Sequence, residues 1–139
     1  MGRMPDKPPV TTELIWSKDL EFGATSGTHA LAVDGDSATG PSPVQLLAVA
    51  LAACMSIDVV DILRKGRHPV TAFRSRLTGE RSPNPPRKLL TVQVEFTMHG
   101  EIPPAAVERA IALSRDKYCS VWHSLRQDIE LTTAFAIHP

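Results

Sequence analysis

The feature that most constrains the fold is a long, almost uncharged segment, "SPVQLLAVALAACMSIDVVDILRKG", at residues 42–66. Ser42 is a good helix N-cap, and Pro43 suits the first helical position. Two basic residues followed by Gly66 are typical of a helix C-terminus. The sequence therefore predicts one long helix over residues 43–65.

This helix carries apolar side chains on nearly every side, so it has to be buried on most of its surface. A chain of 139 residues can hardly supply that cover alone, and we expect a homodimer. The uncharged run ends at Asp58 after about a dozen residues, fewer than the roughly 20 that span a bilayer. Because the first ten residues also lack the apolar core of a secretory signal, we expect a cytoplasmic protein without a membrane partner.

The rest of the chain predicts two groups of strands and a second helical region. Short strands punctuated by Gly, Ser and Asp indicate a meander, and two longer alternating runs joined by "SPNPPR" indicate a hairpin. The expected strands are 12–17, 20–25, 29–35, 69–81, 88–100 and 128–138, with a helix at 103–118 and a helical turn at 119–125. We expect their aromatic residues Trp16, Phe22 and Phe96 to lie in the core. The order βββ-α-ββ-α-α-β predicts an α+β fold with mostly antiparallel sheet. Residues 1–10 are polar and proline-rich, so we expect a flexible leader there and one domain at residues 11–139.

Composition narrows the function classes. The chain is 42% hydrophobic and 22% charged, with a formal net charge of +0. Proteins that bind nucleic acids depend on an excess of Lys and Arg to meet the phosphates, so we expect no nucleic-acid partner. A net charge near zero also opposes self-association only weakly.

The chain has two cysteines, Cys54 and Cys119, which a cytoplasmic protein is not expected to hold as a permanent structural disulfide. In the predicted helix, Asp58 and Asp61 follow Cys54 on nearly the same face, and Leu51 precedes it. One interpretation is a buried cysteine that acts as a small hydrophobe. The other is a reactive thiol, which needs a nearby cation because apolar cover and carboxylates both disfavour the thiolate.

Cys119 offers a different pattern, since His123 follows it by one helical turn and Lys117 precedes it. A Cys–His pair of this spacing can form a thiolate at neutral pH or supply two metal ligands. The alternative is that His123 is a surface residue. The five histidines show no ligand spacing, so we predict no metal site and no cofactor. We interpret Asp34 and Asp36 as part of a turn, because the spacing of a calcium loop is missing.

Two segments, "GPSPVQLLAVALAACMSIDVVDIL" and "LSRDKYCSVWHSL", resemble the OsmC/Ohr family of hydroperoxide-resistance proteins, and the element order resembles that family from about residue 11 onward. The resemblance implies an intertwined homodimer with active sites at the subunit interface and antiparallel sheets around the central helices. It also implies thiol-dependent reduction of a small organic hydroperoxide: Cys54 matches the peroxidatic position and Cys119 the resolving position, and a dithiol reduces the resulting disulfide.

The sequence departs from the active members of the family at two places. Val44 stands where they carry a glutamate, and no arginine lies between Arg3 and Arg64 to cover the thiolate. A cation from elsewhere, such as Lys117 or a residue of the partner subunit, would have to replace it. The sequence therefore predicts a peroxidase of reduced activity. Two alternatives stay open: a non-catalytic dimer that binds a small apolar ligand, and a redox sensor.

Overall fold

The long helix begins as its sequence predicts in the computed structural model, which describes residues 7–139. Helix α1 spans Pro43–Lys65, and Ser42 and Gln45 cap its first turn reciprocally. The Gln45 backbone N–H donates to Ser42 Oγ at 3.3 Å, and the Ser42 N–H donates to Gln45 Oε1 at 2.9 Å. This capping box satisfies two backbone donors that a helix start otherwise leaves without partners.

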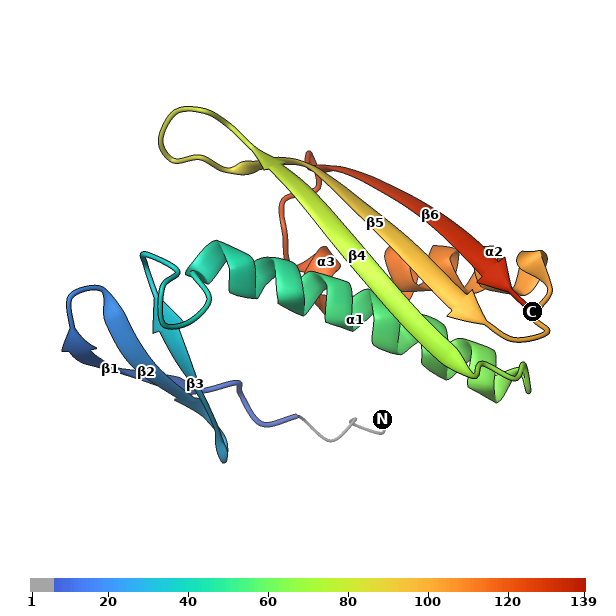
Figure 1. Ribbon diagram of the computed structural model, residues 1–139, viewed down its shortest axis with the longest axis horizontal. Helices are drawn as coiled ribbons and strands as arrows, with labels where there is room; N and C mark the ends of the chain where they lie inside the picture. The colour runs from blue at the N-terminus through green and yellow to red at the C-terminus, as the bar shows by residue number, and fades with distance from the viewer. Residues whose placement is uncertain (1–6) are drawn as a thin grey trace, which may run out of the picture. The chain divides into compact units, whose positions relative to one another are not determined.

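The chain divides into two compact units, Met1–Leu46 and Leu47–Pro139, and each is described by itself. The predicted leader, residues 1–10, lies largely outside the described residues. In the N-terminal unit, three strands form an antiparallel sheet in the order β1-β2-β3 (Figure 1). Their bounds are Thr12–Lys18, Glu21–Ser26 and His29–Asp34, close to the predicted ranges.

The Asp34 carboxylate organises the loop that follows β3. Its two oxygens accept backbone N–H groups from Asp36, Ala38 and Thr39 at 2.9, 3.1 and 3.0 Å, as well as the Thr39 hydroxyl at 3.1 Å. These hydrogen bonds favour the ionised form and lower the pKa of Asp34. The segment is a turn, as the sequence predicts, and its buried carboxylate is committed to the backbone of the loop.

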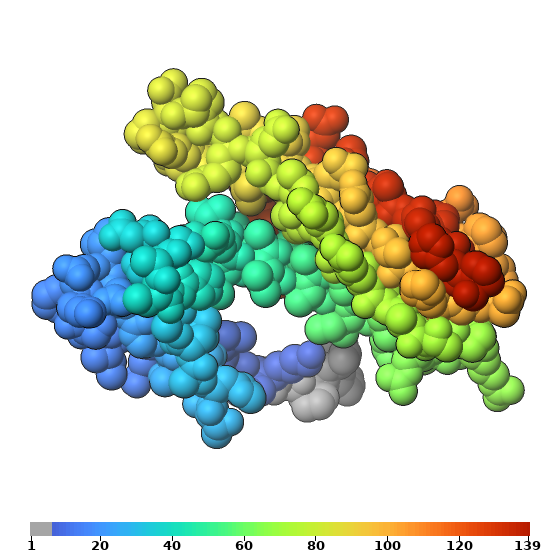
Figure 2. Space-filling view, viewed as in Figure 1, coloured from blue at the N-terminus to red at the C-terminus, as the bar shows by residue number. Residues whose placement is uncertain are grey.

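The C-terminal unit is a two-layer structure built on a second three-stranded sheet, in the order β4-β5-β6. In the space-filling view, these strands form adjacent yellow-green, gold and red bands (Figure 2). Most of α1, two shorter helices and a short π-helix complete the unit. The bounds are β4 Ala72–Arg81, β5 Leu89–His99, α2 Pro104–Leu113, η1 Ser114–Tyr118, α3 Ser120–His123 and β6 Glu130–His138.

Strand β6 runs parallel to β5, whereas β4 and β5 form the expected antiparallel hairpin. A parallel pair needs a crossover connection, and α2, η1 and α3 supply it. The sequence predicts the strand and both helical segments but does not specify this direction. The fold is therefore α+β with mostly antiparallel pairing, as predicted, and contains one parallel pair.

The core of the C-terminal unit lies between one face of this sheet and the helices. Alternate residues of β5 are buried, and so is one stripe of α1 with four residues at i, i+4, i+8 and i+12. These are Val92, Val94, Phe96 and Met98 in β5 and Leu51, Met55, Val59 and Leu63 in α1. Each such side chain contributes roughly 1.5–3 kcal/mol when fully buried, so this contact holds α1 against the sheet.

Several apolar side chains outside this core are exposed. Phe96 is buried as expected, but the prediction for Trp16 is wrong because 63% of it is accessible. Its indole N–H donates to the Asp19 carbonyl at 2.8 Å. The opposite face of α1 is also open, with Val49 61% and Ile57 67% exposed.

The complete helix is also longer than the uncharged run suggests. Helix α1 has 23 residues and is long and apolar enough, by length and composition, to cross a membrane. The core helix of a soluble protein passes the same test, so this is weak evidence for a membrane span. It nevertheless corrects the prediction that the segment is too short.

Gly100 provides a test of the crossover geometry. Its φ is +138°, a backbone conformation that residues with a side chain rarely adopt, and an added Cβ would overlap the Pro69 carbonyl oxygen. We expect Gly100→Ala to lower the free energy of unfolding by about 1–3 kcal/mol, measured by urea denaturation. Gly23→Ala is the matched control, since nothing lies within 4 Å of a Cβ there. Equal stability of the two variants would contradict this geometry.

Candidate functional site

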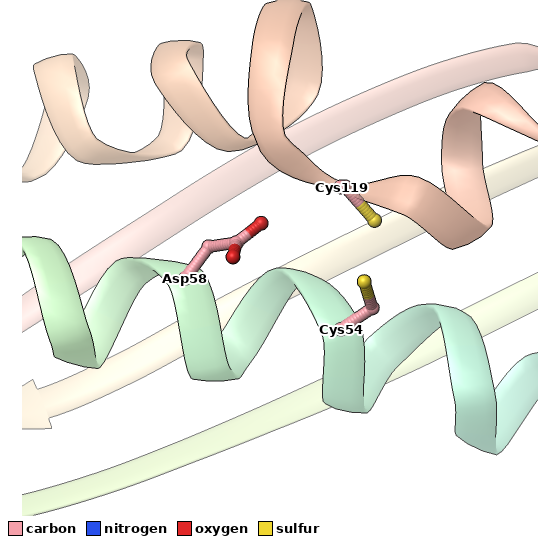
Figure 3. Close-up of side chains that lie close together, drawn as sticks. All are labelled: Cys54, Asp58 and Cys119. Atoms are coloured by element: carbon pink, nitrogen blue, oxygen red, sulfur yellow. The ribbon is translucent and has the colours of Figure 1, made fainter. Parts of the chain in front are cut away.

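The two cysteines come from different elements and face one another within the C-terminal unit (Figure 3). Cys54 lies in the middle of α1, one residue before buried Met55, so the core stripe of α1 fixes the direction of its side chain. Cys119 lies between η1 and α3. The sulfurs of Cys54 and Cys119 and a carboxylate oxygen of Asp58 all lie within 4.8 Å of one another. Both cysteines are free thiols.

A π-helical turn brings Cys119 into this position. The Cys119 N–H donates to the Ser114 carbonyl, five residues earlier, at 2.8 Å. With a regular helical period, the buried residue after Ser114 would be Tyr118, but Tyr118 is 51% exposed and Cys119 is fully buried. The extra residue in the turn explains this offset, and π-turns of this kind are frequent at functional sites. The sequence predicts a regular helix here, and its pattern does not reveal the extra residue, because the burial of Ser114 and Cys119 is known only from the structure.

The two thiols differ in their environments. Cys54 is half-buried, whereas Cys119 has no accessible surface. The Trp122 backbone N–H donates to Cys119 Sγ at 3.4 Å. The Cys54 sulfur and Ser120 Oγ form a weaker contact at 4.0 Å.

Burial dominates the ionisation of Cys119 and raises its pKa from 9.0 to about 11. The hydrogen bond from Trp122 acts in the opposite direction, and the neighbouring Cys54 and Asp58 raise the pKa further. Cys119 is therefore a neutral thiol near pH 7. Because the more exposed Cys54 lacks this complete burial, the two cysteines are suited to different roles.

Asp58 belongs to the site, whereas Asp61 does not. The Ser114 hydroxyl donates to Asp58 Oδ2 at 2.8 Å, linking α1 to the start of η1. Asp61 is exposed and pairs with Lys65 at 2.8 Å. The sequence placed both acids on the Cys54 face, but it gave no sign of the roles of Ser114 and Ser120, which lie far from Cys54 in the chain.

The Cys–His interpretation of Cys119 is not supported by the structure. His123 is exposed, and the donor to the Cys119 sulfur is the Trp122 N–H. The link between His123 and Cys119 is a backbone hydrogen bond of 3.0 Å. His123 is thus a surface residue at the end of α3, as the alternative interpretation held.

The Lys117 ammonium group lies over the Tyr118 ring, 5.2 Å from its centroid.

The raised pKa of Cys119 predicts a change in stability at alkaline pH. The folded state holds the Cys119 proton up to about pH 11, while an ordinary cysteine of pKa 9.0 loses it earlier. The free energy of unfolding of the reduced protein should therefore fall as pH rises from about 9 to about 11. Urea denaturation at several pH values measures this slope. In Cys119→Ala the fall should be smaller; an unchanged slope would contradict the assignment.

The OsmC-like protein family matches residues 34–134. Protein YhfA of Escherichia coli (strain K12) is 36% identical over 125 residues, covering 88% of this chain and 93% of YhfA.

Two solved structures have the same fold. A hypothetical protein from Aquifex aeolicus VF5 has a TM-score of 0.87 at 25% identity and covers 94% of this chain and 97% of its own. An organic hydroperoxide resistance protein from Elizabethkingia anophelis has a TM-score of 0.71 at 12% identity, with coverage of 97% and 100%. Since the family match spans most of the chain and YhfA aligns along nearly its whole length, this chain belongs to the OsmC-like protein family.

Proposed function

We propose that this protein reduces small organic hydroperoxides through a cycle of two thiols. The Cys54 thiolate attacks the terminal peroxide oxygen and becomes a sulfenic acid, and the leaving alkoxide takes a proton from the solvent to give the alcohol. The Cys119 thiol then condenses with the sulfenic acid, giving a disulfide and water. A dithiol reductant returns both cysteines to thiols and is itself oxidised.

The observation that carries this proposal is the asymmetric pair of facing thiols. The two sulfurs and a carboxylate oxygen of Asp58 lie within 4.8 Å of one another, so an approach of the two sulfurs by less than about 3 Å would allow a disulfide. Cys54 is half-buried and accessible to a substrate, which suits the peroxidatic role. Cys119 is fully buried and protonated near neutral pH, which suits a thiol that reacts only with an adjacent sulfenic acid.

Membership of the OsmC-like family supports the same chemistry. A structural neighbour from Elizabethkingia anophelis is named as an organic hydroperoxide resistance protein. A cytoplasmic location also fits, because both thiols need a reducing compartment between cycles.

The electrostatics predict a slow enzyme. Within residues 7–139, the hydrogen-bond partners of the two sulfurs are the Trp122 backbone N–H and the Ser120 hydroxyl, and none is a lysine or arginine side chain. A carboxylate oxygen of Asp58 lies within 4.8 Å of both sulfurs, and its negative charge disfavours a thiolate. A cation from a second copy of the chain would remove this disadvantage.

Counting thiols tests the function directly. We expect the reduced, metal-free protein to lose both thiols after one equivalent of cumene hydroperoxide and to recover them with a dithiol. Intact mass should fall by about two hydrogens, as disulfide formation requires. In Cys54→Ser turnover should be abolished, whereas Cys119→Ser should retain a sulfenic acid that dimedone labels.

The outcomes separate the alternatives. Persistence of both thiols in excess peroxide would favour a non-catalytic binding protein. One oxidation followed by poor turnover would favour a redox sensor. Dimedone labelling of the wild type but not of Cys119→Ser would contradict the assignment of roles.

We also propose that the protein is a homodimer, because each unit exposes apolar side chains that a partner would cover. In the N-terminal unit, β1 exposes Ile15 by 72% and Trp16 by 63%; in the C-terminal unit, α1 exposes Val49 and Ile57. A helix of this composition is stable in water when its apolar surface is buried. The near-zero net charge offers little repulsion between two copies.

Sedimentation tests the dimer. The wild type should sediment as a dimer at micromolar concentration, and Ile57→Glu should shift it toward the monomer because the charge would be buried without a partner. Ala105→Glu, at an exposed position of α2, is the control. A monomeric wild type would contradict the proposal.

A further inference from the structure

The cluster of Cys54, Asp58 and Cys119 has the composition of a site for a thiophilic divalent cation. In a tetrahedral zinc site, Zn–S distances are about 2.3 Å and Zn–O distances about 2.0–2.2 Å, which places the ligand atoms about 3.5–3.8 Å apart. The three ligand atoms here lie within 4.8 Å of one another. Side-chain movements of about 1 Å would therefore bring all three into the range of a single ion.

The charges of the cluster favour a cation more than they favour a thiolate. Asp58 forms no salt bridge within residues 7–139, and its partner there is the neutral Ser114 hydroxyl. If both thiols ionised, as zinc ligation requires, two thiolates and one carboxylate at this separation would repel one another. A divalent cation would remove the repulsion by binding all three groups at once.

Hydrogen bonds orient each potential ligand from outside. Ser114 donates to Asp58, and the Trp122 N–H donates to Cys119. Ser120 lies 4.0 Å from the Cys54 sulfur. Metal sites normally have such outer partners, which fix the direction of the ligands.

Cys54 and Asp58 are half-buried whereas Cys119 is fully buried, so the more accessible side of the cluster is that of Cys54 and Asp58. An ion can therefore enter beside Cys54, and its fourth position would be open to water, as in zinc sites with three protein ligands. The sequence predicts no metal site because its histidines lack ligand spacing. This cluster uses no histidine and joins residues that lie 65 positions apart (119 − 54).

We propose that the reduced chain binds one Zn²⁺ ion through Cys54, Asp58 and Cys119. Binding releases the protons of the two thiols and involves no electron transfer, so affinity should rise with pH. A Cys54–Cys119 disulfide would remove two of the three ligands. Metal binding and oxidation would thus exclude one another, and this last consequence rests on the proposed function.

Metal titration of the reduced, chelator-treated protein tests the site. We expect about one Zn²⁺ per chain in competition with a chromophoric chelator. We also expect Co²⁺ to give the thiolate-to-metal charge-transfer absorption of a site with two sulfur ligands. Cys54→Ser should abolish that absorption. Asp58→Asn should weaken Zn²⁺ binding at least about tenfold, the lower limit of what loss of an outer hydrogen-bond partner costs.

Asp61→Asn is the matched control, because Asp61 lies one turn further along α1 and is exposed; its Zn²⁺ affinity should equal that of the wild type. Circular dichroism confirms that each variant is folded. Equal weakening by both substitutions, or Co²⁺ binding without thiolate absorption, would overturn the proposal. Peroxide turnover is measured separately in the presence of chelator. A wild type that turns over peroxide but binds no Zn²⁺ rejects only the metal site, and one that binds Zn²⁺ but does not turn over peroxide rejects only the peroxidase.

Discussion

The packing of one stripe of α1 against β5 determines the rotation of the helix about its axis, and the position of Cys54 depends on it. Leu51 and Met55 are buried in the core, and Cys54 lies between them in the sequence, so its sulfur projects from the edge of the buried stripe toward Cys119 (Figure 3). Asp58, one turn later, projects from the same side. The hydrophobic contact that stabilises the C-terminal unit thus also aligns the groups of the candidate site.

The opposite side of the site depends on a local irregularity. A regular helix through residues 114–118 would bring Tyr118 to the buried position. The π-turn adds one residue to that turn and buries Cys119 instead. Cys119 then caps α3 through the Trp122 N–H. Its burial has an electrostatic consequence, because a thiol without access to water retains its proton well above neutral pH.

In the candidate site the two sulfurs therefore lie close together, while burial and the Asp58 carboxylate both disfavour the ionisation of a thiol. In a peroxidase, this combination needs a cation to stabilise the attacking thiolate, and within residues 7–139 the site supplies Asp58 instead. Either the proposed dimer or the proposed zinc site would supply positive charge to balance Asp58 and a thiolate. They differ in the source of the positive charge: a side chain of a second copy or a bound ion.

The sequence by itself determined nearly all the elements and the long helix with its cap, because hydrophobic period, Ser-Pro capping and turn residues act locally. It also marked Cys54 and Cys119 as the pair of interest through the family resemblance. Tertiary structure alone decided three further points. These are the parallel direction of β6, the exposure of Trp16, and the meeting of Ser114 with Asp58 beside both thiols. Each depends on which surfaces pack together across long sequence separations, and local pattern carries no information about that choice.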